Sequence, residues 1–273
     1  MASIRRALVA LALPVMGAAN AQTESPASKT FFTSKDAVLG LTFVATSAGL
    51  SVFDARIARF FQDTSLIHVR TGQRLDDIFT HINETTLTVG GLATYVVARI
   101  AKQKTIADVA FHTAEAVAAA SLTSQIIRGP LGRARPRDAK PAYDNQYDFE
   151  AFAGFRHFQN RAFPSIHSSS GFAAASAIVA EVQRRNPGAT WAVAVPAYAL
   201  ALTPGLSRMY LGQHWASDIM AGAFLGTFYG WRIVNYSHEH PTTRIDKLFL
   251  GRLEDTHVSR SDGSFTIGWT VKF

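Results

Sequence analysis

Apolar residues fill long stretches of the chain, and short polar segments separate these stretches at intervals that suit helices. Glycine, proline and asparagine residues mark several of the breaks. We predict main helices over residues 34–53, 85–102, 106–128, 168–185, 189–203 and 214–234. A short amphipathic helix is expected over 74–82. The pattern therefore predicts an all-α bundle of about six main helices.

The N-terminal residues differ from this helical region. Residues 1–21 have the pattern of a cleaved secretory signal peptide. Arg5 and Arg6 precede a short apolar run, and the small residues 19–21 suit a cleavage site. Residues 22–35 are polar, and we interpret them as a linker.

The linker leads into a helical domain that we place at 36–235, and a tail follows over 236–273. Within the tail, Ser261-Asp262-Gly263 has the composition of a tight turn. The segment behind it alternates between apolar and polar residues up to Phe273. The tail is therefore expected to carry a small C-terminal β-hairpin.

The composition limits which kinds of reactive site and binding partner are expected. None of the 273 residues is cysteine, which excludes disulfides, a thiol nucleophile and a thiolate metal site. About half of the residues are apolar, and the formal net charge is +7. A positive balance of this size suits an anionic substrate or a membrane surface, and nucleic acid is not an expected partner.

Two locations fit the sequence. The uncharged runs fall short of the roughly 20 residues that a spanning helix needs. This favours a helical bundle that is exported to the periplasm and is associated with a membrane. The alternative is an integral inner-membrane protein with its active site facing the periplasm. It is favoured by a group of basic residues that we place at one end of the bundle, away from the polar runs of residues 128–218 described below. These residues are Arg99, Lys102, Lys104, Arg184 and Arg185.

Three polar runs stand out within residues 128–218. They read R-G-P-L-G-R-A-R-P at 128–136, F-P-S-I-H-S at 163–168 and S-R-M-Y-L-G-Q-H-W-A-S-D at 207–218. Together they supply several cationic donors, two histidines and a carboxylate that can orient a ring. This set of groups suits the binding and reaction of a phosphate oxyanion.

His214 and Asp218 have the sharpest spacing in these runs. They are four residues apart, so on a helix they would share one face. The carboxylate could then accept from one ring nitrogen and leave the other nitrogen as a nucleophile or base. Taken alone, the pair is equally compatible with a His–Asp pair on a helix surface.

The three runs together resemble the signature of the type 2 phosphatidic acid phosphatase and vanadium haloperoxidase superfamily. That signature reads Lys, six residues, Arg-Pro; then Pro-Ser-Gly-His; then Ser-Arg, five residues, His, three residues, Asp. The matching residues are Arg128, Arg135-Pro136, Pro164-Ser165-Ile166-His167, Ser207-Arg208, His214 and Asp218. There are two departures: Arg128 replaces the lysine, and Ile166 replaces the glycine.

The resemblance implies a helical fold with the motifs at one end, and metal-independent hydrolysis of a phosphate monoester without a cofactor. His214 would attack phosphorus and form a phosphohistidine, while Asp218 holds its ring. His167 would protonate the leaving alkoxide and then activate water. The implied phosphate-binding residues are Arg128, Arg135, Ser165, Ile166 through its amide, and Arg208. The expected substrate is a phosphorylated lipid or a small phosphate ester.

Two alternatives stay open. The same kind of site can hold vanadate and oxidise halides, as in a haloperoxidase. The chain could also be a degenerate phosphate-binding protein, because a β-branched Ile166 would be strained if the family's glycine is needed at positive φ. With the glycine replaced but the amide donor kept, we still expect activity.

The remaining candidates are weaker. His112 and Glu115 fall on one helix face, where a pair bonded within the bundle is favoured over a metal or supporting role. His238 and His240 lack further ligands, so no metal site is expected. The aromatic residues crowded into 137–163 are expected to form either a lid beside the phosphate site or a small core of their own.

Overall fold

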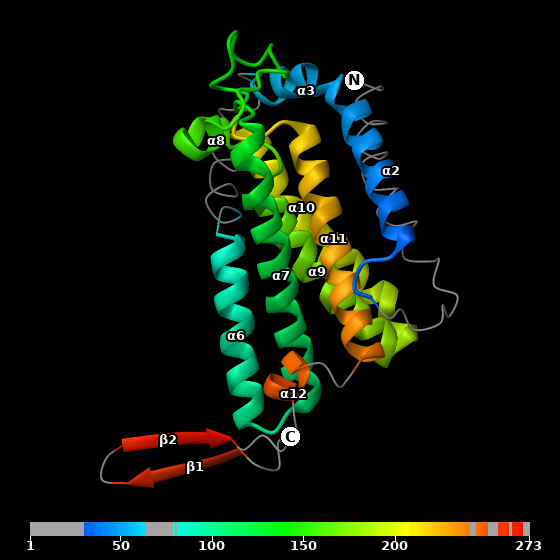
Figure 1. Ribbon diagram of the computed structural model, residues 1–273, viewed down its shortest axis with the longest axis vertical. Coiled ribbons are helices and arrows are strands. Elements are labelled where there is room, and N and C mark those ends of the chain that lie inside the picture. Colours follow the sequence, from blue (N-terminus) through cyan, green and yellow to red (C-terminus); the bar gives the residue numbers. More distant parts are fainter. Residues whose placement is uncertain are drawn as a thin grey trace.

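Long helices dominate the part of the chain that the computed structural model describes, which is residues 30–63, 79, 81–240, 244–250, 256–261 and 264–269. The long helices are α2 (Ser34–Ser51), α6 (Glu84–Ile100), α7 (Lys104–Leu131), α9 (Ile166–Arg185), α10 (Thr190–Tyr210) and α11 (Ala216–Glu239). They form a bundle in which α7, α9 and α11 are central (Figure 1). The expectation of an all-α bundle is confirmed for this region.

Shorter elements lie at the two ends of the bundle. They are α3 (Asp54–Phe61), α8 (Ala153–Arg156), η2 (Phe158–Asn160), η3 (Pro187–Ala189) and α12 (Arg244–Leu250). Two strands, β1 (Thr256–Ser261) and β2 (Ser264–Trp269), pair antiparallel in the tail, where the sequence predicts a hairpin. Several expected features lie outside the described residues. They are the signal peptide, residues 22–29 of the linker, residues 74–78 and 80 of the helix expected over 74–82, and the turn residues Asp262 and Gly263.

Helices α9 and α11 approach each other closely because α11 presents glycines to α9. A Cβ added at Gly222 would lie 2.3 Å from the carbonyl oxygen of Ser165, and one added at Gly226 would lie 2.3 Å from that of Ser169. No side chain larger than hydrogen fits at either position. The glycine seam, as we call Gly222, Gly226 and the α9 backbone facing them, therefore fixes the N-terminal half of α11 against the start of α9.

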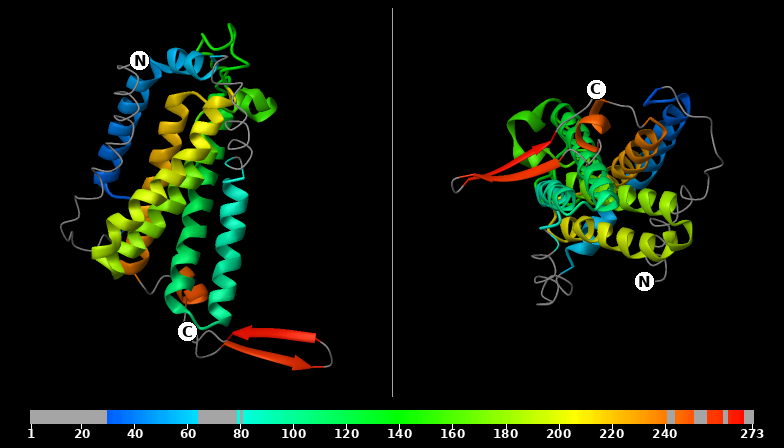
Figure 2. Two further views of the ribbon diagram at one scale, coloured as in Figure 1. Left: turned by 180° about the vertical axis from the view of Figure 1, so that it is seen from behind. Right: turned by 90° about the horizontal axis from the view of Figure 1, so that it is seen from below.

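Small residues fill the core around this seam, and the other long helices cover it. Alanine and valine side chains from α7, α9 and α11 meet in one buried cluster, which includes Val117, Ala173 and Val234. Helix α2 packs on α11, where the rings of Phe43 and Phe224 stack with centroids 4.1 Å apart. Figure 2 shows α6 beside α7 and α10 beside α9, and each of these pairs is in direct contact.

Two helices are longer than the sequence predicts. Helix α7 continues through Pro130 and ends at Gly132, whose φ of 58° provides a left-handed C-cap. Helix α10 continues through Pro204 to Tyr210. The expected helix end at Pro204-Gly205 is therefore wrong. Gly205 serves helix packing here and does not end the helix. Helix α11 lies so close that a Cβ at Gly205 would approach the side chain of Ile219 to 2.8 Å.

Helix topology gathers the three polar runs at one end of the bundle. Helices α7 and α10 end there, and α9 and α11 begin there. The basic residues that close α6, open α7 and close α9 lie at the opposite end, as predicted. The antiparallel arrangement therefore separates a motif end from a basic end.

One described stretch, Pro187–Tyr210, is long and apolar enough to cross a membrane, and only 28% of its most apolar window is buried. The bent pair α2 and α3 would add a second stretch if both helices counted as one span. Large apolar side chains are exposed on α2, α6, α7 and α10, among them Leu41, Val97 and Val195. The outer faces of the bundle are therefore unusually apolar.

Candidate active site

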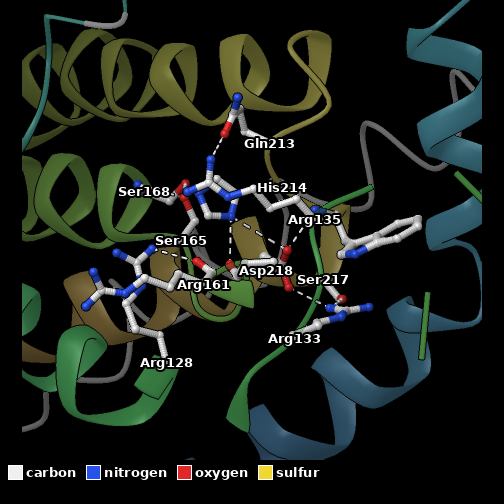
Figure 3. Close-up of polar contacts among 12 residues, drawn as sticks. Arg128, Arg133, Arg135, Arg161, Ser165, Ser168, Gln213, His214, Ser217 and Asp218 are labelled. Atoms are coloured by element: carbon white, nitrogen blue, oxygen red, sulfur yellow. Dashed lines mark hydrogen bonds and ion pairs between the residues drawn. The ribbon is translucent and has the colours of Figure 1, made fainter. Parts of the chain in front are cut away.

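The structure brings the predicted residues together from four separate segments of the chain. Arg128 lies in the last turn of α7, His167 in the first turn of α9, and Arg208 in the last turn of α10. His214 follows in the loop before α11, and Asp218 lies in the first turn of that helix. Figure 3 shows several of these side chains around one region.

His214 is buried, and its orientation differs from the prediction. The residue precedes α11 instead of lying on it, and its Nδ1 is 2.7 Å from the carbonyl oxygen of Ala162. A carbonyl can only accept, so Nδ1 carries the proton and Nε2 carries the lone pair. The nearest carboxylate oxygen of Asp218 lies 3.6 Å from Nδ1. The backbone of Ala162 therefore sets the tautomer, and Asp218 adds its charge beside it.

Asp218 is held by groups other than His214 because it closes a helix cap. Its Oδ2 accepts from the backbone N–H of Trp215, the N-cap of α11, across 2.7 Å. Its Oδ1 accepts from Nη1 of Arg133 across 2.5 Å. These bonds and the neighbouring His214 keep the pKa of Asp218 low despite complete burial, so the carboxylate stays ionised.

Arg133 and Asp54 extend this network, and neither was singled out from the sequence. Nη2 of Arg133 donates to Asp54 across 2.8 Å, and Nη1 also donates to the hydroxyl of Ser217 across 2.8 Å. Asp54 accepts in turn from the backbone N–H of Ser217. Arg133 is thus a fork between two buried carboxylates, one on α3 and one on α11.

His167 and Arg208 form the second contact between motifs. Nη2 of Arg208 lies 2.7 Å from Nε2 of His167. A guanidinium can only donate, so Nε2 accepts and Nδ1 carries the proton. Burial, the positive charge of Arg208, and the nearby His214 and two more arginines together lower the pKa of His167 to about 2. His167 is therefore neutral in this arrangement.

Three arginines surround the same region with unsatisfied donors. The Nε groups of Arg128, Arg135 and Arg161 are buried, and none has a hydrogen-bond partner among the described residues. The same holds for Nδ1 of His167. Burial lowers the pKa of Arg128 and of Arg135 to about 10, which leaves both protonated at neutral pH. Arg161 was missed from the sequence, where only its place two residues before the second motif marks it.

The start of α9 adds backbone donors. Ser165 is the N-cap, and its hydroxyl oxygen accepts from the N–H of Ser168 at 3.4 Å. Ile166 is buried and is the first residue of the helix. It is not among the residues with positive φ, so the strain considered for this position is absent. A helix N-terminus at this place presents N–H groups to an anion.

Aromatic side chains of the 137–163 segment lie beside the arginines. The guanidinium of Arg135 stacks over the ring of Phe158 at 4.0 Å, and a Cβ at Gly129 would meet the ring of Phe155 at 2.4 Å. Phe149, Phe152, Phe155 and Phe158 are nevertheless exposed. The expected core of its own is not formed: Ala139, Ala162 and Tyr143 pack into a buried cluster that is shared with α3 and Trp215. The segment thus presents an apolar rim next to the cationic region.

The remaining histidine candidates lie elsewhere. The predicted pairing of His112 with Glu115 is not what the structure shows: Nδ1 of His112 lies 2.5 Å from Glu181. His238 contacts the same carboxylate, whereas His240 bonds to a backbone carbonyl. Long-range packing of α7, α9 and α11 decides these partners, and sequence spacing does not reveal it.

Comparisons with known proteins agree with the geometry. Residues 110–241 match the PAP2 superfamily. Lipid A 1-phosphatase of Porphyromonas gingivalis is 32% identical over 117 residues, which cover 41% of this chain and 25% of that protein. Lipid A 4'-phosphatase of Bacteroides thetaiotaomicron is 28% identical over 119 residues, covering 43% of this chain and 48% of that protein. The chain thus spans about a quarter and about half of these relatives.

One solved structure is also similar, a transmembrane PAP2 type phosphatidylglycerolphosphate phosphatase from Bacillus subtilis. Its sequence is 20% identical, and the alignment covers 78% of this chain and 99% of that chain with a TM-score of 0.49.

Proposed function

We propose, because residues 110–241 match the PAP2 superfamily, that the protein is a phosphoric monoester hydrolase that acts on lipid phosphates through a phosphohistidine. The proposal rests first on the four buried N–H groups without partners, which belong to Arg128, Arg135, Arg161 and His167. Buried donors normally find acceptors. The oxygens of a phosphate group would satisfy them through charge-assisted hydrogen bonds.

The first half of the reaction would use His214. Its Nε2 lone pair forms the bond to phosphorus while the bond from phosphorus to the ester oxygen breaks. Positive charge then develops on the ring, and the neighbouring carboxylate of Asp218 stabilises it. The arginines bind the equatorial oxygens, whose charge they offset in the transition state.

His167 would supply the proton for the leaving oxygen, and this requires a change at Arg208. In the resting arrangement Arg208 occupies Nε2 of His167. A bound phosphate draws Arg208 to its own oxygens and offsets the positive charges that lower the pKa of His167. The ring then takes up a proton and passes it to the alkoxide. In the second half it removes a proton from water, whose oxygen attacks phosphorus and displaces His214.

The substrate class follows from the surroundings of the site and from the relatives. Both curated relatives are lipid A phosphatases by name. The exposed rings of Phe149, Phe152, Phe155 and Phe158 would give acyl chains an apolar surface beside the cationic region. We therefore propose a phosphorylated lipid, and lipid A phosphates are the first candidates to test.

We propose that the protein is exported and is held at a membrane with its active site facing the periplasm. The apolar outer faces of α6, α7 and α10 support contact with lipid, and one candidate span lies in this region. A signal peptide at 1–21 would direct export. The placement is tested by fractionation, in which extraction of the protein from membranes should require detergent instead of carbonate or high salt.

Activity is tested by phosphate release from lipid A, phosphatidic acid and p-nitrophenyl phosphate, each with and without vanadate. Release that vanadate inhibits competitively supports the phosphatase. Vanadate-dependent bromination would instead indicate a haloperoxidase. Absence of both activities would indicate a phosphate-binding protein. Serine substitutions at Phe155 and Phe158 should lower lipid turnover more than p-nitrophenyl phosphate turnover. Trp191→Ser, an exposed aromatic residue at the start of α10, is the matched control.

A further inference from the structure

A second cluster of chemically capable side chains lies at the basic end of the bundle. His112 comes from α7, Glu181 from the last turns of α9, and His238 from the last turn of α11. Glu181 is 14 residues beyond His167 on α9, which places it about 21 Å along the helix at 1.5 Å per residue. The cluster is therefore separate from the phosphate site.

The three side chains converge on one point. Nδ1 of His112 lies 2.5 Å and Nε2 of His238 lies 3.0 Å from the same oxygen, Oε1 of Glu181. All three atoms fall within 4.8 Å of one another. The side chains of His112 and Glu181 are 3% and 0% exposed, while His238 is 28% exposed. The point is thus enclosed by protein with one side open to entry.

Each inner ligand is held from behind by a partner. Nε2 of His112 lies 3.0 Å from the hydroxyl of Ser237, which donates to Asp246 on α12 across 2.6 Å. The second oxygen of Glu181 accepts from Nε of Arg185 across 2.9 Å. Histidines and carboxylates that bind metal ions are oriented in this way by outer hydrogen bonds.

The outer hydrogen bonds leave three ligand atoms facing one another. Ser237 gives its one proton to Asp246, so its oxygen accepts from Nε2–H of His112. Nδ1 of His112 then faces Oε1 of Glu181, as Nε2 of His238 also does. A divalent ion bound by these three atoms would leave every outer hydrogen bond in place.

We infer that His112, Glu181 and His238 form a structural metal site whose best-fitting ion is Zn²⁺. Two imidazole nitrogens and one carboxylate oxygen are ligands that zinc prefers, and water would complete a four-coordinate shell on the open side. The ion would join α7, α9 and α11 at the end of the bundle opposite the phosphate site. It would take no part in the phosphatase reaction.

The inference is tested on the full-length chain, without an affinity tag, dialysed against chelator and then against metal-free buffer. Adding Zn²⁺ should raise the melting temperature by several degrees and restore about one zinc per chain by mass spectrometry. Co²⁺ in its place should give the visible absorption bands of a low-coordinate site. An unchanged melting temperature and no retained zinc in the wild-type chain would overturn the inference, whatever the variants do.

Variants locate the ion. His112→Gln and His238→Gln should each weaken Zn²⁺ binding by at least about 10-fold, since even outer-partner changes at metal sites cost this much. His240→Gln is the matched control, because His240 lies two residues beyond His238 and bonds to the carbonyl of Tyr236 instead. Equal Zn²⁺ binding in all three variants and wild type would place the metal elsewhere and overturn the assignment.

Discussion

Arg133 donates to Asp218 across 2.5 Å, and it is this arginine, outside the three-part signature, that holds the carboxylate beside His214. The same guanidinium reaches Asp54 on α3. One side chain therefore pairs with two carboxylates that lie 164 residues apart in the sequence. Without it, two buried negative charges would lie next to each other and next to His214.

Replacing Arg133 should damage both stability and activity. Arg133→Leu leaves two buried carboxylates unpaired, and breaking buried pairs typically costs about 3–5 kcal/mol. Arg133→Lys keeps the charge but cannot bridge both carboxylates, so it should fold better and still turn over substrate slowly. Denaturant unfolding and phosphate release on both variants test this. Arg137→Leu, at an exposed position of the same segment, should change neither by much. Wild-type stability in Arg133→Leu would show that the bridge between Asp54 and Asp218 is dispensable for folding.

Changes at the histidines should separate the two halves of the reaction. His214→Ala should reduce turnover by several orders of magnitude in a folded protein, because no atom is left to bond to phosphorus. Asp218→Asn should be milder, since Ala162 still orients the ring. His167→Gln should trap the intermediate when the leaving group is p-nitrophenolate, which needs no acid, because water is no longer activated. Quenching in an alkaline denaturant, in which a P–N bond survives, should then recover phosphate on His214. Recovery of none, with normal turnover in His214→Ala, would rule out the phosphohistidine.

Ile166→Gly should not improve the enzyme. Ile166 begins α9 with an ordinary helical backbone and a buried side chain, so restoring the family's glycine relieves no strain. Removing a buried isoleucine costs about 2–5 kcal/mol, and glycine in a helix about 0.5–1 kcal/mol more. We expect a lower melting temperature and flat or reduced catalytic efficiency on p-nitrophenyl phosphate. A gain in efficiency would contradict the geometry at this position.

Stability should fall as the pH falls below about 6.5. Burial lowers the pKa of His167 and of His214 in the folded chain, whereas both titrate near 6.5 when unfolded. Below that value the unfolded state binds more protons, and each histidine can remove up to about 1.4 kcal/mol per pH unit. Denaturant melts at pH 7.5, 6.5 and 5.5 should show this. The decline should be shallower in His167→Gln and unchanged in His157→Gln, whose residue is exposed. A slope that His167→Gln leaves unaltered would contradict the assignment.

Chelation should separate stability from chemistry. The phosphate site uses arginines for the positive charge that a metal would give, so turnover well below the melting temperature should persist in excess chelator. The melting temperature itself should fall if the His112–Glu181–His238 site has been emptied. Both are measured on one chelated sample, and Zn²⁺ is then restored. Loss of turnover at a temperature where the chelated chain is still folded would mean that a metal acts in the reaction.

The sequence predicted the parts of the structure that local patterns control. Apolar periodicity located the long helices, and motif spacing located His167, Arg208, His214 and Asp218, which the fold brings to one end. Prediction from the sequence failed where tertiary packing overrides a local signal. Pro204 and Gly205 resemble a helix stop, but contact with α11 carries α10 past them.

Contacts between residues far apart in the sequence could not be predicted either. Asp54 lies on the short helix α3, which the sequence did not predict, and its role depends on contact with Arg133 and Ser217. Arg133 lies within the first polar run, but it is not a signature residue, and that run is its one signal in the sequence. Nothing in the spacing of His112, Glu181 and His238 indicated that three helices would bring them together.

The glycine seam bears on how this protein can change over evolutionary time. Gly222 and Gly226 let two backbones touch, so His167 and His214 keep their relative position only while that contact is intact. Substitution at the seam should be rejected, because any larger residue moves His167 away from His214. The apolar rim can change more freely, because its rings are exposed, although Phe158 also stacks on the buried guanidinium of Arg135. New substrate preferences should therefore arise by mutation of the rim, while lineages diverge around an unchanged seam.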